Sequence, residues 1–401
     1  MAKKRGQNEG TIFKRKDKDI WVAQISIQGK RISKYGKTQS ECREWIRKMQ
    51  NQVDDGLTIA GAQKTLAKYL EEWLLVHATS IRPKTAEQYN QICKQHIIPN
   101  LGSIKLKDLQ AGHIQSLYSK KLASGTSKRT VVLIHAVLMR SLKQAEKMGI
   151  IGKNPVLAVT RPKVERKEMK VLNDGQVRSL LSAAAGERYE AAFWLAVSTG
   201  MRLGELVGLK WADIEWTNKQ LRVQRQVQRL STGLAFSEPK TKTSRRMIAL
   251  GSEPVEKLRK HLVSQSKDRQ KAGESWIEND LIFPSVIGTP LDPSNLYHIF
   301  KELLKKAQLP PIRFHDLRHT AATLMLLQGT HPKIVQERLG HSDISMTLNT
   351  YSHVIPSMQA EAAEKLDELL MPISVSDEIK QLKERGADHI SHGDYFIIEN
   401  A

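Results

Sequence analysis

The segment TGMRLGEL at residues 199–206 sets an arginine, Arg202, two positions after Gly200 and three positions before Glu205. Three more segments with charged or ring-bearing side chains follow it along the chain: PKTK at residues 239–242, HDLRH at residues 315–319, and LGH at residues 339–341, which leads to Tyr351. The four segments supply guanidinium, ammonium, imidazole and phenol groups, and no pair of carboxylates with metal-binding spacing stands among them. Such a set predicts chemistry on a phosphate ester.

The two arginines of these segments, Arg202 and Arg318, suit the oxygens of a phosphodiester. A guanidinium donates two parallel hydrogen bonds, so a pair of arginines can neutralise both non-bridging oxygens as charge builds up in the transition state. Glu205 is expected to orient Arg202 rather than to act on the substrate itself. The sequence therefore predicts a clamp for one phosphate.

Tyr351 is the candidate nucleophile. A tyrosine hydroxyl has an unperturbed pKa of ~10, so near neutral pH it needs a base or a strongly electropositive pocket. His315 and His341 are candidates for both tasks. Lys240 could protonate the departing 5′ oxygen, although Lys242 lies two positions away in the same probable turn. Attack by the phenol stores the phosphodiester energy in a protein–DNA bond, so rejoining requires neither ATP nor a metal ion, and no cofactor is expected.

In these motifs and their order, the sequence resembles the tyrosine recombinases of the phage integrase family, especially integrases of temperate phages and integrative conjugative elements. The family signature falls here on Arg202 with Glu205, Lys240, His315 with Arg318, His341 and Tyr351. The resemblance implies that the arginines hold the scissile phosphate, the lysine protonates the leaving oxygen, and the histidines assist proton transfer and hydrogen-bond the phosphate. The tyrosine would become linked to the 3′ phosphate and leave a free 5′ hydroxyl.

Composition agrees with a nucleic-acid partner. The 401 residues carry a formal net charge of +21, an excess that attracts polyanions at long range. The two cysteines, Cys42 and Cys93, fit neither a disulfide framework nor a cysteine-based metal site, and they favour a reducing cytoplasm. Apolar stretches such as 191–197 are much shorter than a membrane span. We therefore expect a soluble protein without a membrane partner.

The first part of the chain predicts a small sheet closed by a helix. Residues 11–36 alternate in strand fashion, with a turn at residues 28–30, and the residues that share one face are Trp21, Ala23, Ile25 and Ile27. A capping box at residues 38–41 then precedes apolar positions at helical spacing, Cys42, Trp45, Ile46 and Met49. The surrounding basic residues, Lys14, Arg15, Lys16, Lys18, Lys30, Arg31 and Lys34, predict contacts with phosphates. Residues 51–62 are predicted to be a linker.

The remainder of the chain is predicted to be mainly helical. Amphipathic patterns begin at Leu66 and recur at residues 85–96, 112–123 and 128–148, which indicates a helical bundle. Prolines near residue 160 then separate a longer unit, in which residues 221–227 and 246–250 read as strands of a small sheet. Residues after 371 have weak periodicity and form either a tail or a helix that docks elsewhere.

The resemblance assigns these parts to a multidomain tyrosine recombinase fold. It implies an arm-type DNA-binding domain at residues 1–57, a helical, SAM-like core-binding domain at 62–160, a mainly α catalytic domain with a small sheet at 165–370, and a tail at 371–401. The core-binding and catalytic domains would form a C-shaped clamp around the crossover site. Four protomers would act on two duplexes at double-stranded attachment sites, with an excisionase or a host DNA-bending protein as accessory partner, in the cytoplasm of a bacterial host and on its nucleoid.

Three other functions compete with this hypothesis. A protein of the same fold with an inactive site could serve as a DNA-bound regulator. Such a protein would lack a catalytic side chain, but all six signature positions are present. His315 and His319, four positions apart, could ligate zinc in a hydrolase, yet Asp316 replaces the expected glutamate and Arg318 adds positive charge beside the cation. A type IB topoisomerase uses related chemistry, but the arm-type domain argues against simple DNA relaxation.

Overall fold

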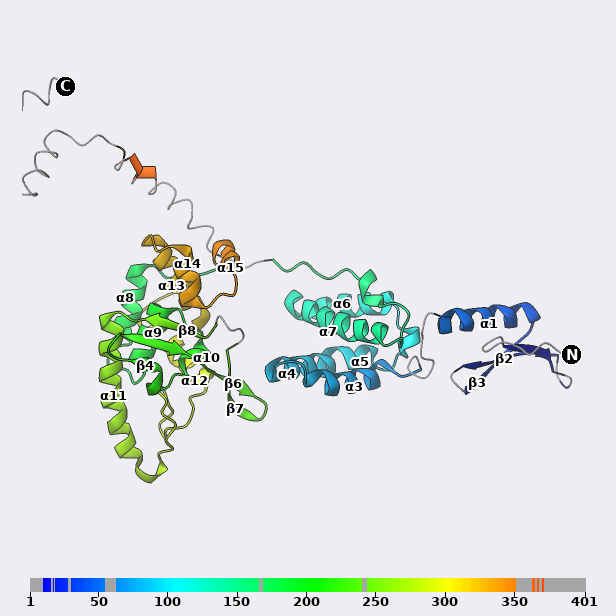
Figure 1. The fold of residues 1–401 in the computed structure, drawn as a ribbon, viewed down its shortest axis with the longest axis horizontal. Helices are drawn as coiled ribbons and strands as arrows, with labels where there is room; N and C mark the ends of the chain where they lie inside the picture. Colours follow the sequence, from blue (N-terminus) through cyan, green and yellow to red (C-terminus); the bar gives the residue numbers. More distant parts are fainter. Residues whose placement is uncertain are drawn as a thin grey trace, which may run out of the picture. The chain divides into compact units, whose positions relative to one another are not determined.

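The computed structural model describes residues 10–15, 17, 19–27, 30–54, 63–165, 169–239 and 244–350, together with 363, 364, 366, 367 and 370. Lys240, Lys242, Tyr351 and the tail predicted at 371–401 lie outside the described residues. The chain divides into two compact units, Met1–Lys167 and Glu168–Ala401 (Figure 1). Within the described part, no helix is both long and apolar enough to cross a membrane.

The N-terminal residues form the predicted sheet and helix. The elements are β1 (Thr11–Lys14), β2 (Trp21–Ile27), β3 (Lys30–Gly36) and α1 (Gln39–Asp54). The three strands are antiparallel in the order β1-β2-β3, and Ala23 and Ile25 of β2 are buried together with Cys42 and Ile46 of α1. The helix continues to Asp54, into the segment predicted to be a linker, so that prediction was wrong for residues 51–54; residues 55–62 lie outside the described part.

The start of α1 shows why the helix begins at Gln39. The hydroxyl Oγ1 of Thr38 accepts a hydrogen bond from the backbone N–H of Glu41, as the predicted capping box requires. The carboxylate of Glu41 accepts from the backbone N–H of Lys37, at 3.1 Å, instead of from Thr38. The reciprocal bond of the box is therefore made one residue earlier than predicted.

Some of the basic residues around the sheet already have acidic neighbours. The ion pairs are Lys14 with Asp19, Arg15 with Asp17 and Lys34 with Glu41. All six side chains are substantially exposed, and exposed pairs of this kind contribute ~0–1 kcal/mol each. A phosphate could displace such carboxylates at little cost in stability.

The next part of the first unit is a bundle of helices. Its elements are α3 (Leu66–Ala78), α4 (Pro83–Ile92), the π-helix η1 (Cys93–Ile97), α5 (Ile98–Leu101), η2 (Leu106–Asp108), α6 (Ala111–Ala123), α7 (Lys128–Lys147) and η3 (Pro155–Ala158). The predicted helices at 85–96, 112–123 and 128–148 are confirmed to within a few residues. The hydroxyl of Tyr69 donates to the backbone oxygen of Ser141 at 2.6 Å, which ties α3 to α7 inside the core.

The second unit carries the four motif segments. Its helices are α8 (Asp174–Ala183), α9 (Glu190–Thr199), α10 (Leu203–Leu206), η4 (Trp211–Asp213), α11 (Ser252–Ala272), η6 (Gly273–Ser275), α12 (Pro293–Lys306), α13 (Phe314–Leu327), α14 (Pro332–Leu339) and α15 (Ile344–Thr350). Its strands are β4 (Ile214–Glu215), β5 (Gln220–Val223), β6 (Gln226–Leu230), β7 (Gly233–Ser237) and β8 (Arg246–Ala249). Strands β4, β5 and β8 form one antiparallel sheet, and β6 and β7 form a separate hairpin.

The strand predicted at 221–227 was wrong in one respect, because it is two strands in two sheets. Between the two strands lie Gln224 and Arg225, whose side chains both bind the buried carboxylate of Asp213. β5 ends before these residues and pairs with β4 and β8, whereas β6 begins after them and pairs with β7. β7 was not predicted at all, and the strand predicted at 246–250 corresponds to β8.

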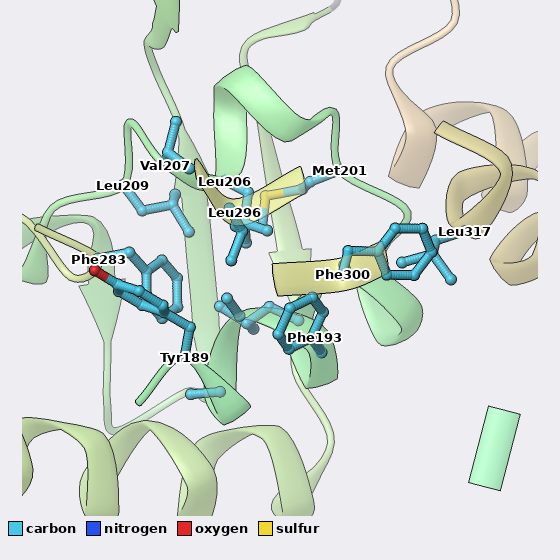
Figure 2. Close-up of a cluster of buried hydrophobic side chains, with 14 of the residues drawn as sticks. Tyr189, Phe193, Met201, Leu206, Val207, Leu209, Phe283, Leu296, Phe300 and Leu317 are labelled. Atoms are coloured by element: carbon cyan, nitrogen blue, oxygen red, sulfur yellow. The ribbon is translucent and has the colours of Figure 1, made fainter. Parts of the chain in front are cut away.

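A hydrophobic core fixes the backbone on either side of the motif residues (Figure 2). Met201 and Leu206, which bracket Arg202, are both buried in this core, and so is Leu317, the residue before Arg318. Phe193 of α9 and Phe300 of α12 lie in the same cluster, with ring centroids 6.3 Å apart. Each arginine is thus held on a backbone that the core makes rigid.

Candidate active site

Arg202 is placed by the sharp turn between α9 and α10. Gly200 ends α9 in the left-handed conformation, with φ 64°, which an L side chain rarely adopts. The chain then passes through Met201 to Arg202, the N-cap residue of α10. The guanidinium of Arg202 donates to Oε1 of Glu205 at 2.6 Å, and its backbone N–H donates to Oε2 at 3.1 Å. Glu205 therefore fixes both the backbone and the side chain of Arg202, as predicted from its spacing.

The two side chains of this ion pair differ in their exposure to solvent. Its side chain is 1% exposed, whereas the side chain of Arg202 is 31% exposed and can still meet a phosphate. Burial alone would raise the pKa of Glu205, but the guanidiniums of Arg246 and Arg202 outweigh burial and hold that pKa below its usual value. The carboxylate stays ionised and is shared between two arginines.

Arg318 reaches the same turn from α13. Its Nη1 donates to the backbone oxygen of Gly200 at 2.9 Å, across 118 positions of sequence, and the residue is almost fully buried. A side chain at Gly200 would also meet Leu339 of α14, since a Cβ there would lie 2.5 Å from Leu339 Cδ2. The structure therefore brings together three of the motif segments around one glycine.

His315 lies in the first turn of α13, beside His319. The two rings are nearly perpendicular, and their centroids are 5.1 Å apart. Although His315 presents much of its surface to solvent, partial burial of its ring lowers its pKa to about 4, with further contributions from His319, Arg318 and Arg202. His315 is therefore a neutral imidazole at neutral pH.

His341 follows α14, whose last residue, Leu339, is succeeded by Gly340 in the left-handed conformation. Its Nδ1 lies 2.8 Å from the hydroxyl of Thr347, a fully buried residue of α15. Burial, together with the positive charges of Arg318 and Arg202, lowers the pKa of His341 to about 4. Because α15 ends at Thr350, the contact ties His341 to the helix that immediately precedes Tyr351.

The neighbours of these histidines bear on the zinc hypothesis. Asp316 is buried and accepts hydrogen bonds from the backbone N–H and the guanidinium of Arg313, which anchors the start of α13. For the zinc hypothesis, no group of three potential metal ligands among His, Cys, Asp and Glu occurs in the described part of the chain. His315 and His319 thus have no third candidate ligand there.

Sequence reasoning missed a buried arginine of this site. Arg246 of β8 donates from Nη2 to Oε2 of Glu205 at 3.0 Å, and its side chain is 6% exposed. Nothing in the local pattern distinguishes this residue from the neighbouring Arg245, which is exposed and pairs with Glu238. The structure separates them because β8 begins at Arg246, whereas Arg245 lies in the bend before the strand.

The low pKa of both site histidines predicts a loss of stability in mild acid. Unfolding restores an ordinary histidine pKa of ~6.5, so between about pH 6.5 and about pH 4 the unfolded chain binds more protons than the folded one. The free energy of unfolding is expected to be highest above this window and to decrease as the pH falls through it. Urea unfolding at a series of pH values measures this slope, which should be shallower for His341→Gln; an unchanged slope would contradict the pKa of His341.

Comparisons with known proteins identify the family. The model of the Phage integrase family matches residues 170–358, and the model of the phage integrase N-terminal SAM-like domain matches residues 65–122. The tyrosine recombinase XerC-like protein of Caldanaerobacter subterraneus subsp. tengcongensis is 32% identical over 397 residues, covering 92% of this chain and all of that protein. The chain therefore belongs to the phage integrase family, and it is a site-specific tyrosine recombinase.

Solved structures share the fold. The integrase of transposon Tn1549, in complex with transposon right-end DNA, superposes with a TM-score of 0.63 at 24% identity, covering 77% of this chain and all of that one. The lambda integrase tetramer bound to a Holliday junction gives a TM-score of 0.54 at 22% identity, covering 87% of this chain and 96% of that one. The predicted fold class, a small sheet, a SAM-like helical domain and a mainly helical catalytic domain, is confirmed.

Proposed function

We propose that this recombinase integrates a mobile DNA element by forming a transient bond between Tyr351 and a 3′ phosphate at its attachment site. The observation that carries the proposal is the convergence of Arg202 and Arg318 on the turn at Gly200, beside two neutral histidines. The carboxylate of Glu205 lies beside Arg202 and Arg246, and Arg318 adds its positive charge at His341; an excess of positive charge of this kind favours an anion. The anion in question is the scissile phosphodiester.

The chemistry follows from these charges. The phenolic oxygen of Tyr351 bonds to phosphorus, the bond from phosphorus to the 5′ oxygen breaks, and that oxygen takes a proton from Lys240, or from Lys242 if its side chain is the nearer one. Arg202 and Arg318 hold the non-bridging oxygens as charge grows on them. Rejoining reverses each step, with the 5′ hydroxyl as the attacking group.

The pKa values of His315 and His341 would rise when DNA binds. With a pKa of about 4, His315 and His341 are poor proton acceptors before a phosphate arrives. A negative phosphate beside them favours their charged form and raises each pKa toward its ordinary value. Proton transfer from Tyr351 would thus become favourable only when the substrate is in place. The hydroxyl of Thr347 engages Nδ1 of His341, so Nε2 is the nitrogen left for the substrate.

The other parts of the chain supply DNA contacts in this proposal. Residues 1–57 would bind arm-type sites through the basic sheet, and the helices of residues 62–160 would hold the core site together with the catalytic domain of residues 165–370. The lambda integrase structure is a tetramer on a Holliday junction, which supports four copies of this chain acting on two duplexes. An excisionase or a host DNA-bending protein would set the balance between integration and excision.

The proposal is tested by trapping the intermediate. A nicked suicide duplex carrying the joined ends of the element loses its short 5′-hydroxyl fragment after cleavage, so the protein cannot rejoin the strand. We expect an adduct that survives denaturant, forms equally in the presence of a metal chelator, and yields a DNA-linked peptide containing Tyr351 in mass spectrometry. Binding without any adduct would instead identify a silent DNA-binding regulator, and an activity that the chelator removes would revive a metal-dependent mechanism.

A further inference from the structure

Arg246 makes hydrogen bonds in three directions from a buried position. Nη2 donates to Oε2 of Glu205 at 3.0 Å, Nη1 donates to the backbone oxygen of Ser244 at 3.0 Å, and Nε donates to the backbone oxygen of Arg338 at 2.5 Å. The residue is the first of β8, and β8 begins soon after the segment that contains Lys240 and Lys242. The three acceptors lie 41, 2 and 92 positions away in the sequence.

Each acceptor belongs to, or adjoins, a different motif segment. Glu205 holds Arg202 by its side chain and its backbone. Ser244 is the first described residue after the segment 240–243. Arg338 directly precedes the segment LGH at residues 339–341. One guanidinium therefore contacts the residue that holds Arg202, a residue near the lysine segment in the sequence, and the residue that precedes the segment of His341.

Arg338 returns contacts in the opposite direction. Its Nη1 donates to the backbone oxygen of Ala249 at the end of β8, and its Nη2 donates to the backbone oxygen of Ser198 near the end of α9, each at 3.1 Å. Helix α14 is thus bonded both to the strand of Arg246 and to the turn that precedes Arg202. The hydrogen bonds of Arg246 and Arg338 therefore link β8, α9, α10 and α14 to one another.

The shape of the guanidinium, in addition to its charge, is needed for this arrangement. Burial lowers the pKa of Arg246, while the carboxylate of Glu205 opposes that effect. A lysine at this position would keep the positive charge beside Glu205, but its single ammonium on a flexible stem cannot reproduce three donors fixed in one plane. Charge and geometry can therefore be separated by substitution.

We propose that Arg246 is a positioning residue whose planar guanidinium sets Arg202, and with it the clamp on the scissile phosphate, in register with the lysine and histidine segments. It touches neither substrate nor reacting atoms and acts through Glu205 and through the backbone of Ser244 and Arg338. The inference rests on the proposed function of Arg202 as a phosphate ligand.

The test compares Arg246→Lys with the parent protein on two substrates. One is the nicked suicide duplex, and the other is the same duplex with a neutral methylphosphonate at the scissile position. On the ordinary phosphate, Arg246→Lys is expected to form adduct about 10²-fold more slowly, the effect of misplacing a catalytic group by about 1 Å, with unchanged affinity for the duplex. On the methylphosphonate, where less charge is left for the clamp to neutralise, the variant should approach the parent rate.

A matched control is Arg188→Lys. Arg188 pairs with Asp268 at 2.9 Å and donates to the backbone oxygen of Ser285, so the exchange disturbs a comparable partly buried network that contacts none of the motif segments. Its adduct rate should equal that of the parent. A second variant, Arg246→Gln, removes the charge but keeps a donor for Glu205, and it should show the same substrate dependence as Arg246→Lys.

Three results would overturn the inference. If Arg246→Lys cleaves the phosphate at the parent rate, a positive charge at this position is enough and the planar guanidinium is not needed. If both Arg246 variants are slowed equally on the two substrates, the defect does not act through the clamp and is a general loss of structure, which their thermal unfolding would also report. If the parent itself forms no adduct, the proposed function fails, and the role of Arg246 fails with it.

Discussion

Tyr351→Phe is expected to form no covalent adduct on the suicide duplex while it binds that duplex with parental affinity. The substitution removes one oxygen, which is the atom proposed to bond to phosphorus, and it keeps the ring. No other side chain in the motif segments can form the same 3′-phosphotyrosyl bond. The measurement is the fraction of labelled strand that stays with the protein after denaturation, followed to many times the parental reaction time.

The matched control is Tyr297→Phe. Tyr297 lies on α12, where the ammonium of Lys301 lies 5.1 Å from its ring centroid, and it belongs to no motif segment. This variant should form adduct at the parent rate. An adduct with Tyr351→Phe, or the loss of adduct with Tyr297→Phe, would show that another residue is the nucleophile.

Arg202→Ala is expected to slow adduct formation by about 10²- to 10³-fold, the usual loss when one preorganised donor to a developing oxyanion is removed. The fold should survive, because the buried carboxylate of Glu205 keeps its hydrogen bond from Arg246. DNA affinity should change little, since Arg202 would contribute one phosphate contact among many. Single-turnover cleavage at saturating protein concentration separates these quantities.

Arg178→Ala is the control for this second substitution. Arg178 pairs with Asp174 on the exposed surface of α8, one turn apart, and such a pair contributes little to stability. Arg178→Ala should cleave at the parent rate. A loss of only a few-fold in Arg202→Ala would mean that Arg202 supports the fold of the turn and does not hold the phosphate.

Periodicity predicted the elements whose apolar residues are local neighbours. Cys42 and Ile46 are one helical turn apart, and Ala23 and Ile25 alternate along one strand, so each pair indicates a buried face without knowledge of the partner element. Arg202 and Glu205 are likewise three positions apart, and their ion pair could be anticipated. Motif order then predicted that Arg202, Arg318, His315 and His341 lie in one site, and the structure brings these four together; their catalytic roles, and the positions of Lys240 and Tyr351, stay predictions.

The features that sequence reasoning missed depend on partners far away along the chain. Arg246 is buried because Glu205 and the carbonyl of Arg338 accept its hydrogen bonds, whereas an arginine in a strand otherwise indicates a solvated position. The break between β5 and β6 arises because Asp213 binds both Gln224 and Arg225, whereas the residues around them suit a continuous strand. Local patterns carry no record of such contacts.

The left-handed turn at Gly200 has a consequence for how this enzyme can vary. Arg318 and Leu339 both meet the turn from segments more than a hundred residues downstream, with α11 and α12 on the intervening chain. The loops that join these helices can lengthen or shorten without moving the reactive groups, provided that the helices keep their places in the core and the crossing point keeps a residue with no side chain. Tolerance to insertion and intolerance to a single methyl group therefore coexist in one domain.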